Sequence, residues 1–566
     1  MSDNKIDGGE AVLEAFRHLG FDYILSSPGS EWAPVWEALA RQKANNTPGP
    51  KYIDCWHETL AVDMALGYAL ATGRLQPVLL HAGAGLLQGS MGIHAAHIAG
   101  IPVLIMSGEA LTYGENPELD PGSQWYRNLS VVGGPDGLVK PFVKWSNRIT
   151  SSHTLYETII RAAEMAARIP RGPVFLNLPV ETMLQEWTPP RHFRNPPAPP
   201  KTHTPAADIE ALARRLVAAE NPIVTTETAG RDPDAFAALV ALADRLALPV
   251  IESRASVCAN FPKDHPLHQG FNIGPVLKET DLALMVSSRA PWYPPGNRPP
   301  KATVVAIDED PLRSYMVYQN LQADLYLEGD VAATLRGLDE AVRSLNPDAV
   351  KIEQRRARLT AAHAGAAARR RTAEAETKSK RPIDPLALCA ALRDSLPADT
   401  IYVDETIVHS SLLQEHLPWN EPHSYFYVQG GLGQGIGVAL GVKLAKPERP
   451  VALMIGDGGL LYNPIIQGLA ASSHNRLPLL VVVFNNRKYA SMKANHLRYY
   501  PKGIAQTTGV FHGVEIDPPD FAKLTIHFGG FGRTVEAPEE LPAVLRQAAA
   551  AVAKGETAII NVLLGC

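Results

Sequence analysis

The feature that most constrains the fold of this chain is a repeated alternation of short apolar runs with helix-forming stretches. Early in the chain the runs are FDYILSS, PVLLHAG, IPVLIMS and GPVFLNLP, and late in the chain they are TIYVDE, PVALMIGD, LPLLVVVFNN and TAIINVLL. Near-continuous apolar runs are typical of strands that are covered on both faces. Helical stretches between such strands predict βαβ units. We therefore expect an α/β protein built from doubly wound parallel sheets.

Shifts in composition divide the chain into three parts. With 566 residues, the chain is too long for a single hydrophobic core. The first part, residues 1–184, ends before the proline-rich stretch WTPPRHFRNPPAPPKTHTP, which we interpret as an extended linker. A second part spans residues 206–345, and a charged, alanine-rich stretch, interpreted as a helical connector, leads to the third part, residues 385–566. Three α/β domains are therefore expected.

The charge and the cysteine pattern exclude several classes of protein. The formal net charge is -5 and no block of Lys and Arg forms a basic patch, so we expect no nucleic-acid partner. The four cysteines lie far apart without a CxxC pair, so no disulfide framework or thiolate metal site is expected. The N-terminus lacks a signal-peptide pattern, and no apolar run reaches the ~18 residues of a membrane span. We expect a cytoplasmic protein with no membrane segment.

Polar residues follow two of the predicted strands in the last part of the chain. Asp457 comes directly after PVALMIG, and Asn485 and Asn486 come directly after LPLLVVVF. Because neighbouring parallel strands end at the same sheet edge, these side chains should lie close together. A carboxylate, an amide oxygen and a nearby backbone carbonyl are hard oxygen ligands that suit Mg²⁺. Alone, each pair would indicate only a turn, but together they predict a magnesium and diphosphate site.

These residues resemble a motif of a known family. GDG at 456–458 and NN at 485–486 are similar to the thiamine diphosphate and magnesium motif of thiamine-dependent 2-oxo acid decarboxylases and carboligases. Further segments follow in the order of that family: SSPGS at 26–30, HET at 57–59, HAGAG at 81–85, KPFVKWS at 140–146, RGPVFLNLP at 171–179 and QGGLGQGIG at 429–437. The layout is most similar to benzoylformate decarboxylase and more distantly to acetolactate synthase-like enzymes. The resemblance implies a pyrimidine-binding first domain, a central Rossmann-like domain and a diphosphate-binding last domain.

The resemblance assigns catalytic roles to Glu58, His81 and Ser30. Thiamine must lose its thiazolium C2 proton, and the 4′-imino nitrogen of its own pyrimidine is the base. Glu58 corresponds to the glutamate that bonds pyrimidine N1′ and favours that tautomer, although a helix dipole alone also favours an acid in a first turn. Ser30 and His81 match positions that hold the substrate carboxylate and relay protons in benzoylformate decarboxylase. Without the resemblance, a histidine at a strand end would more often be structural.

The resemblance also implies a set of cofactor contacts. Leu432 corresponds to the apolar residue that keeps the cofactor bent, and the backbone carbonyl of Gly430 would accept a hydrogen bond from the 4′-amino group. His409 lies where the family places small hydroxyl residues near the diphosphate. The other implied cofactor contacts are Pro28, Gly29, Glu58, Gly456, Asp457, Gly458, Gly459 and Asn486. The implied metal ligands are Asp457, Asn486 and Lys488.

The chain departs from the family pattern in its central part. Trp292 and Tyr293 stand where benzoylformate decarboxylase has a second catalytic histidine, so its proton relay cannot be transferred intact. Five residues could line an aromatic-friendly pocket or belong to the core: Trp32, Trp125, Trp292, Tyr293 and Leu460. Some relatives bind FAD in this domain, but PIVTTETAGRDPDAF lacks a glycine-rich fingerprint after its strand, so we do not expect FAD.

The resemblance implies a lyase that decarboxylates a 2-oxo acid through a C2 ylide and an enamine. The alternative is a carboligase, similar to acyloin or acetolactate synthases, in which the enamine attacks a second carbonyl compound. A catalytically silent homologue that binds the cofactor is the alternative without enzyme activity. In the family, Glu58 and the GDG motif of one site come from different subunits. We therefore expect a homodimer or homotetramer with active sites at subunit interfaces, acting on a small 2-oxo acid or aldehyde.

Overall fold

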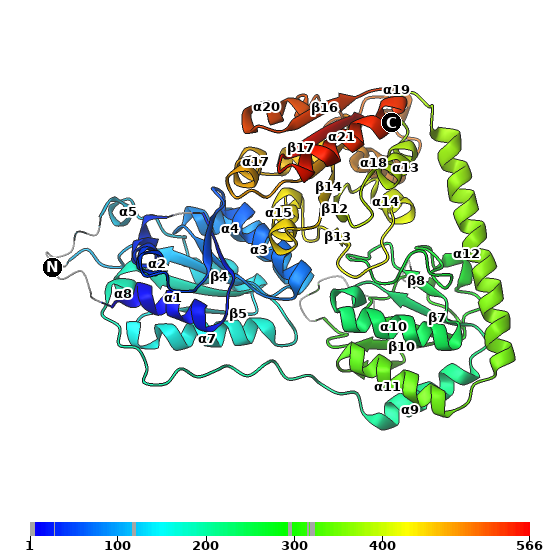
Figure 1. Ribbon diagram of the computed structural model, residues 1–566, viewed down its shortest axis with the longest axis horizontal. Helices are drawn as coiled ribbons and strands as arrows, with labels where there is room; N and C mark the ends of the chain where they lie inside the picture. Colours follow the sequence, from blue (N-terminus) through cyan, green and yellow to red (C-terminus); the bar gives the residue numbers. More distant parts are fainter. Residues whose placement is uncertain are drawn as a thin grey trace. The chain divides into compact units, whose positions relative to one another are not determined.

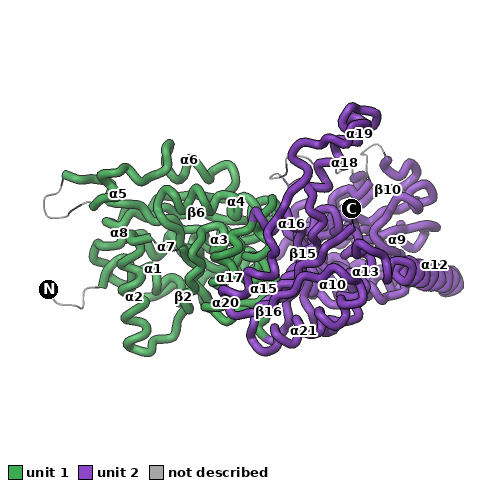
Figure 2. Tube along the Cα trace, turned by 90° about the horizontal axis from the view of Figure 1, so that it is seen from above, with its two compact units in different colours: residues 1–200, 429–447, 463–477 green, residues 201–428, 448–462, 478–566 purple. Residues whose placement is uncertain are grey.

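The structure is a computed structural model that describes residues 6–27, 29–115, 120, 122–292, 297–313, 316 and 323–565. Its strands form three sheets in which neighbouring strands run parallel, so the α/β fold class is confirmed (Figure 1). The chain divides into two compact units (Figure 2). The first contains residues 1–200, 429–447 and 463–477, and the second contains residues 201–428, 448–462 and 478–566.

The sheet of the first unit has the strand order β2-β1-β3-β4-β6-β5. Its strands are β1 (Tyr23–Ser26), β2 (Lys51–Asp54), β3 (Pro77–Leu80), β4 (Leu104–Glu109), β5 (Trp145–Arg148) and β6 (Val174–Pro179). The chain order reverses at β1, whose neighbours are β2 and β3. Ligands of open α/β sheets bind at such a switch point, outside the carboxyl ends of the strands. The segments after β1 and β3 contain Ser30 and His81.

The helices of the first unit include one pair that packs unusually closely. They are α1 (Gly8–His18), η1 (Ser30–Trp32), α2 (Ala33–Ala44), α3 (Glu58–Thr72), α4 (Ala84–Ala99), α5 (Gly122–Tyr126), α6 (Pro135–Val139), η2 (Lys140–Phe142), α7 (Ser152–Ala167), α8 (Val180–Leu184), α15 (Gly435–Ala445) and α17 (Ile465–His474). Helix α3 is buried on almost all sides because α4 and α15 cover it. A Cβ atom on Gly441 of α15 would lie 2.0 Å from the backbone oxygen of Met64, so the two backbones can approach only at glycine.

The central sheet belongs to the second unit and has the order β11-β10-β9-β7-β8. Its strands are β7 (Pro222–Thr226), β8 (Val250–Glu252), β9 (Leu282–Val286), β10 (Thr303–Asp308) and β11 (Leu325–Glu328), and its helices are α9 (Ala206–Ala218), η3 (Ala229–Arg231), α10 (Pro233–Leu246), η4 (Gly274–Val276) and α11 (Val331–Ser344). Residues 187–205, in the proline-rich stretch before it, form neither helix nor strand. The predicted helical connector is confirmed as α12 (Ala349–Thr377).

The third sheet has the order β13-β12-β14-β15-β17-β16. Its strands are β12 (Ile401–Glu405), β13 (Tyr425–Tyr427), β14 (Val451–Gly456), β15 (Leu480–Asn485), β16 (Phe531–Val535) and β17 (Ala558–Leu563). The remaining helices are α13 (Pro385–Ser395), α14 (Ser410–His416), α16 (Asp457–Tyr462), α18 (Ala490–Tyr499), α19 (Ile504–Thr508), η6 (Phe521–Leu524), α20 (Thr525–Phe528), η7 (Pro538–Glu540) and α21 (Leu541–Ala553). Strands β14 and β15 are neighbours, with Gly456 level with Phe484. This register brings the two predicted polar turns together at one edge.

Within the described part of the chain, none of the helices combines the length and the apolar character needed to cross a membrane.

Candidate functional site

Two of the predicted catalytic residues meet in the first unit. Glu58 is the first residue of α3, and His81 follows β3. A Cβ atom on Gly85, in the first turn of α4, would lie 2.8 Å from the Cβ of His81 and 3.1 Å from Oε1 of Glu58. Both side chains therefore flank the same helical turn, where only a glycine leaves them room. Next to Glu58, Nδ1 of His57 is buried and has no hydrogen-bond partner among the described residues.

A third residue of this site, Glu31, was missed by the sequence analysis. The Nδ1 atom of His81 lies 3.0 Å from both carboxylate oxygens of Glu31, and the backbone N–H of Ala82 donates to Glu31 Oε1 at 2.7 Å. The hydrogen bond to Glu31 raises the pKa of His81, against the opposing effect of burial, and the charges of Glu31 and Glu58 act in the same direction. The available signal was an acid directly after Ser30, in a segment that leaves the end of a buried strand.

Ser30 lies at the same edge of the sheet, in the segment that follows the carboxyl end of β1. It begins the short helix η1, it is exposed, and its Oγ accepts a hydrogen bond of 3.0 Å from Nε2 of Gln124 in α5. A Cβ atom on Gly29 would lie 2.3 Å from Nδ1 of His81, so the glycine lets the chain pass beside the imidazole. Pro28 lies outside the described residues. The structure thus brings Gly29, Ser30 and His81 together.

The glycine-rich segment before α15 lies against α4. Gly430 has a φ of +94°, and a Cβ atom there would lie 2.5 Å from Cα of Ala95. A Cβ atom on Gly431 would lie 3.0 Å from Sδ of Met91. Leu432, between these glycines and Gly433, is half-buried. The first unit therefore holds the predicted residues Glu58, His81 and Gly430 beside α4.

The predicted metal-binding carboxylate lies at the end of β14 in the second unit. Asp457 is buried, its Oδ1 accepts a hydrogen bond of 2.8 Å from the N–H of Gly458, and its Oδ2 accepts one of 2.6 Å from the N–H of Arg487. Burial raises the pKa of Asp457, while these backbone hydrogen bonds oppose the rise. The contact with Arg487 joins the turn after β14 to the turn after β15, as the sequence predicts.

The two adjacent asparagines have different surroundings. Asn485 is buried, and its Nδ2 donates to Oδ1 of Asn561 at 3.0 Å. Asn486 is half-buried, and its Oδ1 accepts the N–H of Lys488 at 3.0 Å. The side chain of Asn485 therefore links β15 to β17, whereas Asn486 lines a cavity.

The cavity beside Asn486 has a volume of about 460 Å³. His409, Asn486 and Lys488 line it, together with three further basic side chains, those of Lys380, Arg381 and Lys493. Asp457 does not line this cavity. Its carboxylate accepts the backbone N–H of Arg487, the residue between Asn486 and Lys488. The cavity is suited to an anion because most of its charged side chains are basic.

His409 is a buried wall residue of this cavity. It precedes α14, it is 7% exposed, and its ring centroid lies 5.4 Å from that of Phe484. Burial lowers the pKa of His409 to about 4, so the imidazole is neutral at pH 7. A neutral imidazole can donate one hydrogen bond to a phosphate oxygen without adding positive charge.

Asp457 and Asn486, at the ends of β14 and β15, are oxygen donors of the kind that a hard cation such as Mg²⁺ binds. No group of three or more His, Cys, Asp or Glu side chains that could hold a metal is present in the residues that the structure describes. One carboxylate, one amide and backbone carbonyls are the ligands of a hard cation whose shell is completed by phosphates and water. A Cβ atom on Gly456 would meet nothing within 4 Å, so there is open space beside the strand end.

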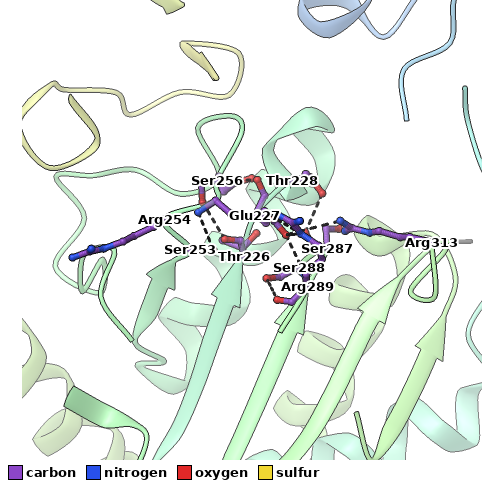
Figure 3. Close-up of polar contacts among 12 residues, drawn as sticks. Thr226, Glu227, Thr228, Ser253, Arg254, Ser256, Ser287, Ser288, Arg289 and Arg313 are labelled. Carbon is purple, nitrogen blue, oxygen red and sulfur yellow. Dashed lines mark hydrogen bonds and ion pairs between the residues drawn. The ribbon is translucent and has the colours of Figure 1, made fainter. Parts of the chain in front are cut away.

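The carboxyl ends of the central strands carry a different polar cluster, shown in Figure 3. Glu227 follows β7 and is buried, and it accepts hydrogen bonds of 3.0 Å from both the backbone N–H and Nε of Arg289. Nη1 of Arg313 lies 3.9 Å from the same carboxylate. Nη2 of Arg313 lies closer to Asp308, 3.0 Å from its Oδ2. Arg289 and Arg313 are therefore paired with two carboxylates, those of Glu227 and Asp308, at this edge of the sheet.

Two of the four candidate aromatic residues are core residues. Trp32 is fully buried, and its Nε1 donates to the backbone oxygen of Leu80 at 2.8 Å. Trp292 is buried in an apolar cluster of the central sheet with Ile251 and Met285. The core alternative therefore holds for Trp32 and Trp292, whereas Trp125 is 39% exposed and Leu460 is buried. Tyr293 lies outside the described residues.

Comparison with known proteins identifies three successive matches to one family. Residues 6–126 match the N-terminal TPP binding domain of thiamine pyrophosphate enzymes, residues 209–338 match their central domain, and residues 408–562 match their C-terminal TPP binding domain. These matches confirm the resemblance that the sequence motifs indicate.

Individual relatives cover nearly the whole chain. The chain is 28% identical to benzoylformate decarboxylase of Pseudomonas aeruginosa over 96% of each protein. It is 25% identical to the acetolactate synthase large subunit of Haemophilus influenzae, over 96% of this chain and 92% of that protein. The fold matches the thiamine diphosphate-dependent 4-hydroxybenzoylformate decarboxylase of Rhodococcus jostii RHA1 with a TM-score of 0.79, at 24% identity over 99% of each chain. The chain therefore belongs to the thiamine pyrophosphate enzyme family and contains its N-terminal, central and C-terminal domains in that order.

Proposed function

We propose that this protein binds thiamine diphosphate together with Mg²⁺ and decarboxylates a 2-oxo acid. One observation carries the proposal: Glu58 and His81, which follow different strands, flank the first turn of α4 at Gly85. A carboxyl group and an imidazole in this position can exchange protons with a cofactor and a substrate. The proposed domains are residues 1–184 for the pyrimidine, 206–345 for the central domain and 385–566 for the diphosphate.

The second unit offers a place for the diphosphate and its metal. Asp457, Asn486 and the backbone carbonyl of Lys488 would hold Mg²⁺ as hard oxygen ligands. The glycines around Asp457, at positions 456, 458 and 459, would let the diphosphate approach the backbone. His409 would donate a hydrogen bond to a phosphate oxygen, because its low pKa leaves it neutral with one N–H.

The residues of the first unit would serve the pyrimidine and the substrate. Bound thiamine diphosphate would supply a nucleophilic carbon for the carbonyl group of the acid and a thiazolium ring that accepts the electron pair left when carbon dioxide departs. Glu58 would hold a proton at pyrimidine N1′, and the backbone carbonyl of Gly430 would accept a hydrogen bond from the 4′-amino group. Leu432 would support the bent shape of the cofactor. Ser30, with Pro28 and Gly29 before it, would orient the substrate carboxylate, and His81 would deliver a proton to the product.

Carboligation is the second candidate function. The 25% identity to an acetolactate synthase over 96% of this chain supports it. Both functions share the loss of carbon dioxide and differ in the next step, which is either protonation or attack on a second carbonyl compound. A catalytically silent homologue is disfavoured because the chain carries Glu58, Asp457 and Asn486 together. In every case we propose a homodimer or homotetramer with active sites at subunit interfaces, as in the family.

Product analysis tests this proposal. The purified protein would be incubated with thiamine diphosphate, Mg²⁺ and a panel of aromatic and aliphatic 2-oxo acids, with and without an added aldehyde. We expect release of carbon dioxide and formation of the corresponding aldehyde from at least one acid. Glu58→Gln should still bind the cofactor but lose turnover by about 10²-fold or more. A hydroxyketone as the main product would move the assignment to carboligase, and cofactor binding without carbon dioxide release from any acid would refute both.

A further inference from the structure

The contact between Glu31 and His81 has an unusual asymmetry. The side chain of Glu31 is 0% exposed, whereas that of His81 is 26% exposed. Nδ1 of His81 is engaged by both carboxylate oxygens of Glu31 at 3.0 Å, and no hydrogen bond to Nε2 is formed within the described ranges. One edge of the imidazole is therefore fixed inside the protein, and the other edge can exchange a proton with a ligand or with solvent.

The surrounding backbone is shaped around the carboxylate of Glu31. A Cβ atom on Gly108, in β4, would lie 2.1 Å from Cγ of Glu31, and a Cβ atom on Gly29 would lie 2.4 Å from its Oε1. The N–H of Ala82 fixes Oε1 at 2.7 Å. Gly29 and Gly108 thus leave space for this side chain, and the backbone of Ala82 binds it. A buried carboxylate is costly unless it is paired and hydrogen-bonded, and here both partners belong to the segment that carries His81.

We propose that Glu31 is the positioning residue of His81, which keeps the proton on Nδ1 and leaves Nε2 as the only edge that gives and takes a proton. This inference rests on the proposed function, in which His81 delivers the proton that follows loss of carbon dioxide. The same arrangement recurs wherever a carboxylate fixes the tautomer and orientation of a catalytic imidazole.

The charges around His81 favour its protonated form. Glu31 and Glu58 both raise the pKa of His81. Glu109 adds to the acidic surroundings of Glu31, although burial raises the pKa of Glu109 itself and Ser130 donates a hydrogen bond of 2.9 Å to it. During the reaction the Nε2–H bond would break as a C–H bond forms at the carbon that lost carbon dioxide. His81 would remain as the neutral Nδ1–H tautomer until Nε2 takes a proton from solvent.

A titration of His81 in the full-length protein tests the inference without any substrate. Histidine labelled with ¹³C would be followed by NMR as the pH is varied, with the His81 signal assigned from its loss in His81→Asn. Glu31→Gln should lower the pKa of His81 by about 1–3 units, because it removes a buried opposite charge. Glu31→Asp, which keeps the charge, should restore most of the shift. The control is Glu37→Gln on α2, since this carboxylate is 68% exposed, and it should leave the titration unchanged.

The pH profile of the reaction provides the second measurement. Decarboxylation that depends on protonated His81 should fall as the pH rises through the pKa of His81. In Glu31→Gln this fall should occur at a pH lower by the same amount as the NMR shift. With an aldehyde acceptor at fixed pH, the ratio of aldehyde to hydroxyketone should also decrease.

The inference is overturned if the pKa of His81 in Glu31→Gln equals that of the parent. It is also overturned if that pKa shifts but the pH at which decarboxylation falls stays the same. If Glu31→Gln does not fold, Glu31→Asp must retain the raised pKa and the pH profile of the parent, and a loss of either overturns it. These outcomes differ from failure of the proposed function, in which the parent protein releases no carbon dioxide from any 2-oxo acid.

Discussion

At the scale of single residues, His409 illustrates how burial changes the chemistry of a side chain. Its folded pKa of about 4 lies below the usual value near 6.5. The unfolded chain therefore binds a proton in this pH range that the folded protein does not bind, and stability must fall as the pH drops from about 6.5 toward 4. A histidine that the sequence indicates as a phosphate contact thus also makes the last domain sensitive to acid.

The pH dependence of unfolding measures this effect. Between pH 7 and pH 5, without added cofactor, His409 should cost about 2 kcal/mol of unfolding free energy. The variant His409→Gln cannot be protonated, so its urea-unfolding midpoint for the last domain should decrease less over the same range. Equal decreases in the parent and the variant would show that the buried imidazole is not responsible.

Single residues also show where sequence reasoning succeeds and where it stops. Asp457 and Asn486 could be identified because each directly follows an apolar strand, and strand ends meet by simple geometry. Glu31 could not, because its role depends on contact with His81, 50 residues further along the chain. Trp32 was ambiguous for the same reason: whether a large aromatic lines a pocket or the core depends on what packs against it.

At the scale of elements, the turns after β14 and β15 work as one unit. The carboxylate of Asp457 accepts the N–H of Gly458 in its own turn and the N–H of Arg487 in the other. A change at Asp457 can therefore affect both the metal site and the joint between the two strands. The replacement by asparagine removes the negative charge and leaves one oxygen for the two backbone N–H donors, so it weakens both the metal site and the contact between the two turns.

Calorimetry with thiamine diphosphate and MgCl₂ tests the metal role. Asp457→Asn should lower the melting temperature, because one of the two buried backbone hydrogen bonds is lost. It should also bind the cofactor at least ~10-fold more weakly in the presence of Mg²⁺ under conditions in which it is folded, since changes to residues that only orient metal ligands already cost about 10–100-fold. Asp394→Asn, at a carboxylate of the same domain that is 65% exposed, is the control and should bind normally. Unchanged affinity in Asp457→Asn would remove Asp457 from the metal site.

At the scale of the whole molecule, the assembly decides which chains contribute to one active site. The family resemblance implies that Glu58 and the GDG motif of one site come from different subunits. Two inactive variants can test this, Glu58→Gln and Asp457→Asn. In a mixed dimer, sites shared between subunits produce one site with both changes and one site with neither. Sites built from a single chain would instead leave every site with one change.

Mixing the two variants after mild dissociation and reassociation should therefore restore activity. Random pairing of subunits that share their sites should return about a quarter of the parent activity. Each variant alone, treated in the same way, is the control and should stay inactive. No recovery, with mixed oligomers demonstrated by differently tagged subunits, would mean that Glu58 and Asp457 act within one chain.

The sequence by itself determined the α/β class, the parallel sheets and the strand ends that carry the cofactor motif, because periodicity and strand-end geometry are local properties. Only the tertiary structure decided how side chains that are far apart in the chain combine. It paired His81 with Glu31, assigned Asn485 to the sheet and Asn486 to the cavity, and neutralised Arg289 with Glu227. The physical reason is that burial, hydrogen bonding and pKa depend on neighbours in space, which a linear pattern does not specify.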